Sequence, residues 1–271
     1  MKNPEEIKRV VQDKYAAIAQ RGTAPDGSIP ANILCCGEGD GSFAEDYTQV
    51  AGYASEADLG LGCGLPTEYA HIKVGDTVVD LGSGAGNDCF VARSVVGDTG
   101  QVIGVDMIPA MIDKARQNAR KLGFGNVSFR YGEIEDLPLE DCLADVVVSN
   151  CVLNLVPDKA RAFAETYRIL KPGGHFSISD VVVRGNLPDA LRASAELYAG
   201  CVSGAFPQQE YLQTIQQAGF QNVRIQKEHT ITLSDELLRE HLSEEEVALF
   251  KTSDLGIFSI TVYAEKTKGC C

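Results

Sequence analysis

The sequence predicts an α/β protein with a doubly wound sheet, followed by a smaller α+β part at the C-terminus. Two observations support this fold class. Short apolar runs alternate with helical patterns from residue 77 to residue 180, and the first run leads straight into a Gly-rich turn. We expect strands at 77–80, 101–106, 127–130, 144–150 and 174–180, and helices at 88–95, 109–122 and 159–170.

The regions on either side of this alternating stretch differ from it and divide the chain into three parts. Residues 1–64 contain a helix that begins at Pro4, with Ile7, Val10, Val11, Tyr15 and Ile18 on one face, and then a long aperiodic loop with cysteines. We expect that helix to lie over the domain as a lid or flank. Residues 65–182 form the sheet domain. Residues 183–271 form the C-terminal part, with helices at 187–199 and 207–218, two short helices within 235–250, strands at 223–227 and 257–264, and a disordered tail from Lys266.

Composition restricts the partners and the location. The formal charge of −14 over 271 residues argues against nucleic acid and anionic membrane surfaces as partners. No apolar run has the length of a membrane span, and the N-terminus is charged, so we expect a cytoplasmic protein, and we take it to be a monomer. Nine cysteines without any C-x-x-C argue against a zinc ribbon and for catalytic or redox thiols.

The Gly-rich turn is the first candidate binding site. Gly82, Gly84 and Gly86 follow the first strand in the spacing G-x-G-x-G, where a dinucleotide motif would have G-x-G-x-x-G. Asp80 precedes the glycines; its carboxylate would repel a pyrophosphate and suits a ligand that carries an ammonium group. A second acid, Asp106, ends the next apolar run and could accept hydrogen bonds from ribose hydroxyls.

The run Asp80-Leu81-Gly82-Ser83-Gly84-Ala85-Gly86, followed by Asp106, resembles the first motifs of the class I S-adenosylmethionine (SAM) methyltransferases. This resemblance implies a Rossmann-like fold and SAM as cofactor. It further implies a cofactor site that includes Met107 after Asp106, Ile134 against the adenine ring, Glu135 at its exocyclic amine, and Asn150 at the same crevice. The loop around Glu135 reads equally well as a surface cluster of acids.

Three cysteines lie in loops that this fold could bring together. Cys151 directly follows the fourth strand and belongs at the mouth of the crevice. Cys63 lies between glycines, on what we expect to be an exposed and adaptable loop, and Cys201 lies in a third loop. Three soft thiolates in a trigonal arrangement suit a pyramidal centre with a lone pair, such as trivalent arsenic, whereas zinc would require a fourth ligand.

The segments around these cysteines, Gly60-Leu61-Gly62-Cys63-Gly64, Ser149-Asn150-Cys151-Val152-Leu153-Asn154 and Gly200-Cys201-Val202-Ser203-Gly204-Ala205, closely resemble motifs of the arsenite SAM methyltransferases. The resemblance implies that Cys151 and Cys201 bind trivalent arsenicals throughout. It implies that Cys63 is a third ligand and later joins a disulfide, and that a fourth cysteine takes part, for which Cys35 and Cys36 are equal candidates. A thiol reductant such as thioredoxin or glutathione would reset that disulfide.

Two other functions remain open at this point. The chain could methylate a small organic substrate such as a quinone or sterol, with no affinity for arsenite. It could instead be a thiol protein that binds soft metals without using SAM. Of the remaining cysteines, Cys89 reads as a small buried hydrophobic residue. The degree of arsenic methylation and the role of Cys270 and Cys271 are not determined by the sequence.

Overall fold

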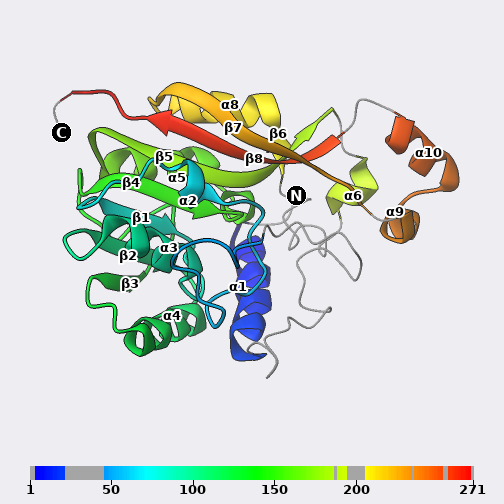
Figure 1. Ribbon diagram of the computed structural model, residues 1–271. Coiled ribbons are helices and arrows are strands. Elements are labelled where there is room, and N and C mark those ends of the chain that lie inside the picture. Colours follow the sequence, from blue (N-terminus) through cyan, green and yellow to red (C-terminus); the bar gives the residue numbers. More distant parts are fainter. Residues whose placement is uncertain are drawn as a thin grey trace.

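The fold is built on one sheet with helices on both faces (Figure 1). A computed structural model describes residues 4–21, 46–185, 188–193, 205–233, 235–252 and 256–269. The strand order is β3-β2-β1-β4-β5-β8-β7, and β6 pairs with β5. The strands from β3 to β5 are parallel to one another, whereas β8 is antiparallel to both of its neighbours, β5 and β7. The strands are β1 Thr77–Leu81, β2 Gln101–Asp106, β3 Val127–Tyr131, β4 Ala144–Asn150, β5 Leu170–Arg184, β6 Phe206–Pro207, β7 Gln221–Ile231 and β8 Gly256–Glu265.

The two faces of the sheet are covered by different helices because successive strand residues point to opposite sides. Val78 on β1 packs in the cluster that includes α1, α3 and α4, while its neighbour Val79 packs in the cluster that includes α5 and α8. The described helices are α1 Pro4–Arg21, α2 Pro66–Tyr69, α3 Asn87–Val96, α4 Pro109–Leu122, η2 Leu153–Leu155, α5 Lys159–Ile169, α6 Asp189–Ala193, α8 Gln208–Gln217, α9 Asp235–His241 and α10 Glu244–Thr252.

The expected alternation of strands and helices between residues 77 and 180 is confirmed, with one difference. We expected the fifth strand to begin at residue 174, but β5 already begins at Leu170. The backbone explains the difference: the Gly173 N–H donates to the Lys266 carbonyl at 3.1 Å, and the Lys266 N–H donates to the Gly174 carbonyl at 2.8 Å. The pairing with β4 is interrupted between Ala144 and Val146 to accommodate these residues.

Lys266 also corrects our expectation of a disordered tail that begins at that residue. Its side chain is 8% exposed, and its Nζ donates to the carbonyls of Leu170 at 2.6 Å and Tyr167 at 2.8 Å. Three satisfied hydrogen bonds to the main chain of β5 and α5, one of them from its own backbone, hold this residue in place. Residues 270 and 271 lie outside the described ranges.

Helix α1 forms as expected, with Val11, Tyr15 and Ile18 buried, although Val10 is 40% exposed and lies off the buried face. In the C-terminal part, α8, α9, α10, β7 and β8 match the expected elements, and the two strands extend the same sheet. The boundaries at residues 64 and 182 stay predictions. None of the described helices is long and apolar enough to cross a membrane.

Candidate active site

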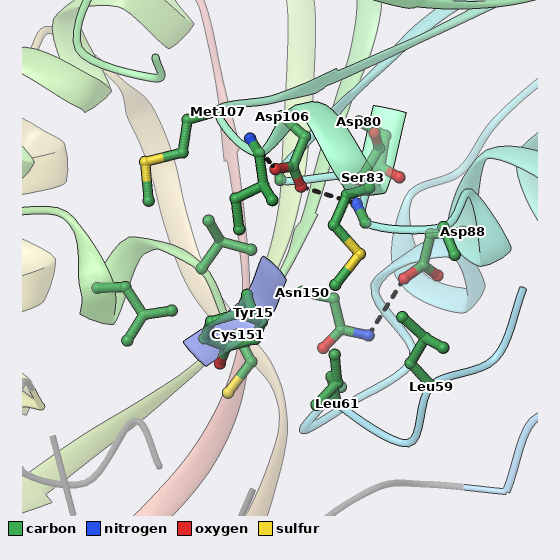
Figure 2. Close-up of a pocket in the computed structure, with 18 of the residues that line it drawn as sticks. Tyr15, Leu59, Leu61, Asp80, Ser83, Asp88, Asp106, Met107, Asn150 and Cys151 are labelled. Carbon is green, nitrogen blue, oxygen red and sulfur yellow. Dashed lines mark hydrogen bonds between the residues drawn. The ribbon is translucent and has the colours of Figure 1, made fainter. Parts of the chain in front are cut away.

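A pocket opens where the parallel strands β1, β2 and β4 end, which is the expected place for a ligand in such a sheet (Figure 2). It encloses about 1090 Å³ of empty space, its mouth included. Figure 2 shows the labelled acids Asp80, Asp88 and Asp106 along one side of this pocket and Cys151 on another. Of the cofactor residues predicted from the sequence, those on its wall are Asp80, Gly82, Gly84, Asp106, Met107, Ile134, Glu135 and Asn150.

The Gly-rich turn forms where the sequence indicated, but its three glycines are required for different reasons. All three have positive φ, at 72° for Gly82, 51° for Gly84 and 100° for Gly86. A Cβ on Gly82 would lie 2.4 Å from Val152, and one on Gly86 would lie 2.9 Å from Phe90. A Cβ on Gly84 would meet nothing within 4 Å, so Gly84 faces open space. Gly86 is not among the residues that line the pocket.

Asp106 fixes the far end of this turn. Its Oδ2 accepts the Gly84 N–H at 2.9 Å, and its Oδ1 accepts the Ile108 N–H at 2.9 Å. Burial raises the pKa of the Asp106 carboxyl to about 6, while these backbone donors favour the ionised form. The carboxylate is therefore oriented by main-chain groups, with lone pairs left for two hydroxyls of a ligand.

The acid side of the pocket contains more acidic side chains than the sequence suggested, because Asp88 joins Asp80 and Asp106. Asp80 is 2% exposed, and its Oδ2 accepts a hydrogen bond from the Cys89 thiol at 3.3 Å. Burial raises its pKa well above the usual value, and the charges of Asp88 and Asp106 add to this effect. Cys89 is buried as expected, but it is also a hydrogen-bond donor rather than only an apolar residue. Acids gathered in this way would be relieved by a cationic ligand.

The residues present fit SAM by a further structural criterion. Ser83 Oγ and Asn87 Oδ1 are buried polar atoms on the pocket wall without a hydrogen-bond partner among the described residues. Unsatisfied polar atoms at a pocket surface are typical of a site that a polar ligand completes. Asp106 and Asp80 both line the pocket, and their expected roles, at the ribose and at the ammonium group of SAM, stay predictions.

The loop after β3 meets α1 across the pocket. Ile134 and Glu135 are 7% and 9% exposed. They therefore belong to the pocket wall and not to a cluster of acids on the surface. Lys8 on α1 lies 2.6 Å from Glu133 Oε2 and 3.3 Å from Glu135 Oε1. Lys8, Val11 and Tyr15 also line the pocket, so α1 covers this side as a lid. Glu135, which we expected to meet an adenine amine, here interacts with Lys8.

The thiol side of the pocket differs from our expectation in one respect. Cys63 is not on an exposed, adaptable loop: it is 3% exposed. Its N–H donates to Asn150 Oδ1 at 3.0 Å, and its carbonyl accepts from Ser259 Oγ. The flanking glycines serve close contact rather than flexibility, because a Cβ on Gly62 would lie 2.6 Å from Asn150 Nδ2 and one on Gly64 would lie 2.5 Å from Ser179 Oγ.

Cys151 lies beside this loop, one residue after Asn150. It is 7% exposed, lines the pocket, and has φ of 60°, a conformation that non-Gly residues seldom adopt. The Cys151 N–H donates to the Ser179 carbonyl at 2.8 Å, which holds it against β5. Cys63 and Cys151 are both reduced thiols. Contacts with Asn150 thus bring the two cysteines together, although 87 residues separate Cys63 from Asn150 in the chain.

A buried phenol, Tyr211, interacts electrostatically with both cysteines and is hydrogen-bonded to a buried acid. Tyr211 and Asp180 are completely buried, and the Tyr211 hydroxyl donates to Asp180 Oδ2 at 3.1 Å. Burial raises the pKa of Asp180 to about 7. Burial also raises the pKa of Tyr211 well above its usual value, and the negative charges of Asp180, Cys63 and Cys151 act in the same direction.

Three predicted site residues, Cys35, Cys36 and Cys201, lie outside the described ranges. Within the described residues, no group of three or more His, Cys, Asp and Glu side chains could hold a metal ion. The sequence analysis missed Lys8, Tyr47 and Asp88, which line the pocket. Asp88 lies two residues after the last glycine of the Gly-rich turn and could have been noted there, whereas nothing near Tyr47 in the sequence marks it.

Comparisons with known proteins agree with this geometry. The family model described as "Methyltransferase domain" matches residues 72–219. The crystal structure of an arsenic(III) S-adenosylmethionine methyltransferase from Chlamydomonas reinhardtii has a TM-score of 0.66 and 37% identity, with 84% of this chain and 73% of that chain covered.

Two curated relatives carry the name arsenite methyltransferase. One, from Halobacterium salinarum, is 44% identical over 245 residues, which are 86% of this chain and 63% of the relative. The other, from Homo sapiens, is 36% identical over 192 residues, which are 68% of this chain and 51% of the relative. The chain therefore spans between half and two thirds of the length of these relatives.

The match of the family model, the Rossmann-like sheet with its pocket at the carboxyl ends of the strands, and the likeness to a solved relative lead to one assignment. The chain belongs to the class I SAM-dependent methyltransferases, in the family of the arsenite SAM methyltransferases.

Proposed function

We propose that the protein transfers a methyl group from SAM to trivalent arsenic, as arsenite or methylarsenite, held by Cys63, Cys151 and Cys201. One observation carries this proposal. Two reduced cysteines from distant parts of the chain lie next to Asn150: Cys63 through its N–H, and Cys151 as the next residue, which lines a pocket rich in buried acids. Soft thiolates bind arsenic, and an acidic pocket suits a cationic methyl donor.

The chain's main contribution to this reaction is proximity and alignment. Bound SAM supplies the methyl group on a positively charged sulfur. The thiolates of Cys63, Cys151 and Cys201 would hold the arsenic with its lone pair toward that methyl group. No general base is required, because the attacking lone pair carries no proton.

Methyl transfer raises arsenic formally from the trivalent to the pentavalent state, so two electrons must be returned. We propose that Cys63 and either Cys35 or Cys36 supply them by forming a disulfide, which thioredoxin or glutathione then reduces. Replacing both Cys35 and Cys36 with Ser should stop turnover after the first cycle. Unchanged first and second methylations in this double variant would contradict the disulfide cycle.

The test of the main proposal is to incubate the purified protein with arsenite, SAM and a thiol, and to identify arsenic species by mass spectrometry. We expect methylated arsenic, with one S-adenosylhomocysteine formed for each methyl group on arsenic. Asp106→Asn is the matched variant: it weakens two charge-assisted hydrogen bonds and should reduce affinity for S-adenosylhomocysteine roughly 10-fold without changing arsenite binding. SAM binding without any methylarsenic would favour an organic substrate, and arsenite binding without SAM binding would favour a thiol protein that only binds metals.

A further inference from the structure

Three side chains outside the thiol set hold the Cys63 loop against the pocket. We call Tyr47, Asp88 and Asn150 the clamp. The Asn150 amide group donates to the Tyr47 hydroxyl at 2.7 Å, the Gly64 carbonyl at 2.8 Å and Asp88 Oδ2 at 3.2 Å. The Tyr47 hydroxyl contacts Asp88 Oδ1 at 2.8 Å and the Gly64 carbonyl at 3.1 Å. The other end of Asn150, its Oδ1, accepts the Cys63 N–H.

The hydrogen atoms available to the clamp explain why its members depend on one another. Asn150 has two N–H groups and Tyr47 has one O–H, and these serve the Gly64 carbonyl, both Asp88 oxygens and the Tyr47 oxygen. The clamp has fewer donor hydrogens than acceptor oxygens. Loss of one donor therefore leaves a partly buried oxygen unsatisfied and makes the remaining hydrogen bonds rearrange. The position of the Cys63 loop therefore depends on all three side chains.

The clamp also forms part of the cofactor pocket. Tyr47, Asp88 and Asn150 line that pocket together with Gly62, the residue before Cys63. Figure 2 shows the contact between Asn150 and Asp88 on the pocket side, with Leu59 and Leu61 of the loop beside it. A ligand against this wall touches the same side chains that hold the peptide groups of residues 63 and 64.

We propose that Tyr47 and Asp88 are positioning residues, which act through Asn150 to hold the Cys63 thiol in place for methyl transfer and to couple its position to occupancy of the cofactor pocket. This proposal deepens the function proposed above and rests on it for the kinetic effect. Its structural consequence, the protection of Cys63, does not depend on arsenic.

Two variants test the proposal, and a third is the matched control. Tyr47→Phe removes one hydroxyl and keeps the ring in its apolar cluster with Leu65 and Val91. Asp88→Asn replaces the carboxylate that accepts hydrogen bonds from Tyr47 and Asn150. Ser94→Ala is the control, because Ser94 Oγ donates to the Ala51 carbonyl at 3.0 Å and so joins the same loop region to α3 without contact to Cys63.

The direct readout is the rate at which iodoacetamide alkylates Cys63. A protease that cleaves on the N-terminal side of aspartate gives a peptide of residues 58–75, in which Cys63 is the only cysteine. Cys89 lies in a separate peptide and is the internal reference. We expect alkylation of Cys63 to be about 10-fold faster in Tyr47→Phe and Asp88→Asn, since each loses a hydrogen bond of about 1 to 1.5 kcal/mol. S-adenosylhomocysteine should slow the reaction in the wild type and in Ser94→Ala, and should protect less in the two clamp variants.

The kinetic readout separates positioning from general destabilisation. We expect kcat for methyl transfer to fall 10- to 100-fold in both clamp variants, with the apparent KM for SAM changed less than about 3-fold and with Ser94→Ala unaffected. If Cys63 is alkylated at the wild-type rate in folded Tyr47→Phe and Asp88→Asn, the proposal is wrong. If the wild type forms no methylarsenic yet the variants still expose Cys63, the proposed function fails and the clamp's hold on Cys63 is upheld.

Discussion

The acid side and the thiol side of the pocket are assembled in different ways. On the acid side, the residues in contact are close in the sequence: Gly84 and Asp106 are 22 residues apart, and Asp80 and Cys89 are 9 residues apart. On the thiol side, Cys63 reaches across 87 residues to Asn150 and across 196 residues to Ser259. The acid side is therefore formed by neighbouring strands and turns, whereas the thiol side exists only when the whole sheet, including β8, is in place.

The largest effect should come from Cys151→Ser, which removes a soft ligand from the thiol side alone. A hydroxyl ionises poorly and binds arsenic weakly, so methyl transfer should fall by more than about 100-fold while affinity for S-adenosylhomocysteine stays within about 2-fold. Arsenic speciation and calorimetry measure the two quantities. Cys89→Ser is the control, because a serine hydroxyl retains the hydrogen bond to Asp80. Equal losses of cofactor affinity and transfer would show that the two sides are not separable.

Asp180 provides a test by pH. Its folded pKa of about 7 is raised above its unfolded value of 3.8 by burial, so its contribution to stability is complete below about pH 4 and is lost as the pH rises towards 7. Asp180→Asn lacks this dependence. We expect the unfolding free energy of the wild type, relative to the variant, to decrease by about 2 to 4 kcal/mol between pH 4 and pH 8.

Denaturant titrations at four pH values measure this difference. Asp141→Asn, at an exposed acid, is the control and should follow the wild type. A constant difference between the wild type and Asp180→Asn across this range would mean that the buried carboxyl does not change its charge there.

Glycines on the two sides should respond differently to the same substitution. Gly62→Ala places a Cβ 2.6 Å from Asn150 Nδ2, so it should cost about 1 to 3 kcal/mol and displace the Cys63 loop. Gly84→Ala meets nothing within 4 Å, and its cost of about 1 kcal/mol comes from its positive φ alone. Thermal unfolding gives the stabilities, and alkylation of Cys63 should accelerate only in Gly62→Ala. Faster alkylation in both variants would show that the two turns are mechanically linked.

The same difference explains what the sequence could predict. The strands, the Gly-rich turn and Asp106 follow from local patterns, and the structure confirms where they lie. The sequence analysis wrongly predicted an exposed, flexible loop at Cys63, because glycines beside a cysteine usually indicate flexibility. Here Gly62 and Gly64 instead allow close contact with Asn150 and Ser179, which are distant in the chain. Tyr47 gives no local signal either, since its role appears only when β4 brings Asn150 to it.

The smallest effect should come from Lys8, because its ion pairs with Glu133 and Glu135 are partly exposed and such pairs contribute about 0.2 to 1 kcal/mol. These pairs hold α1 over the acid side, so Lys8→Met should release S-adenosylhomocysteine about 2- to 5-fold faster and leave arsenite binding unchanged. Stopped-flow dissociation at low and high salt measures this, and the difference from the wild type should shrink at high salt. Arg9→Met, an exposed change on the same helix, should have no effect. If Lys8→Met instead altered Cys63 alkylation, α1 would act on both sides of the pocket, and the separation between them would hold only for the contacts beneath that helix.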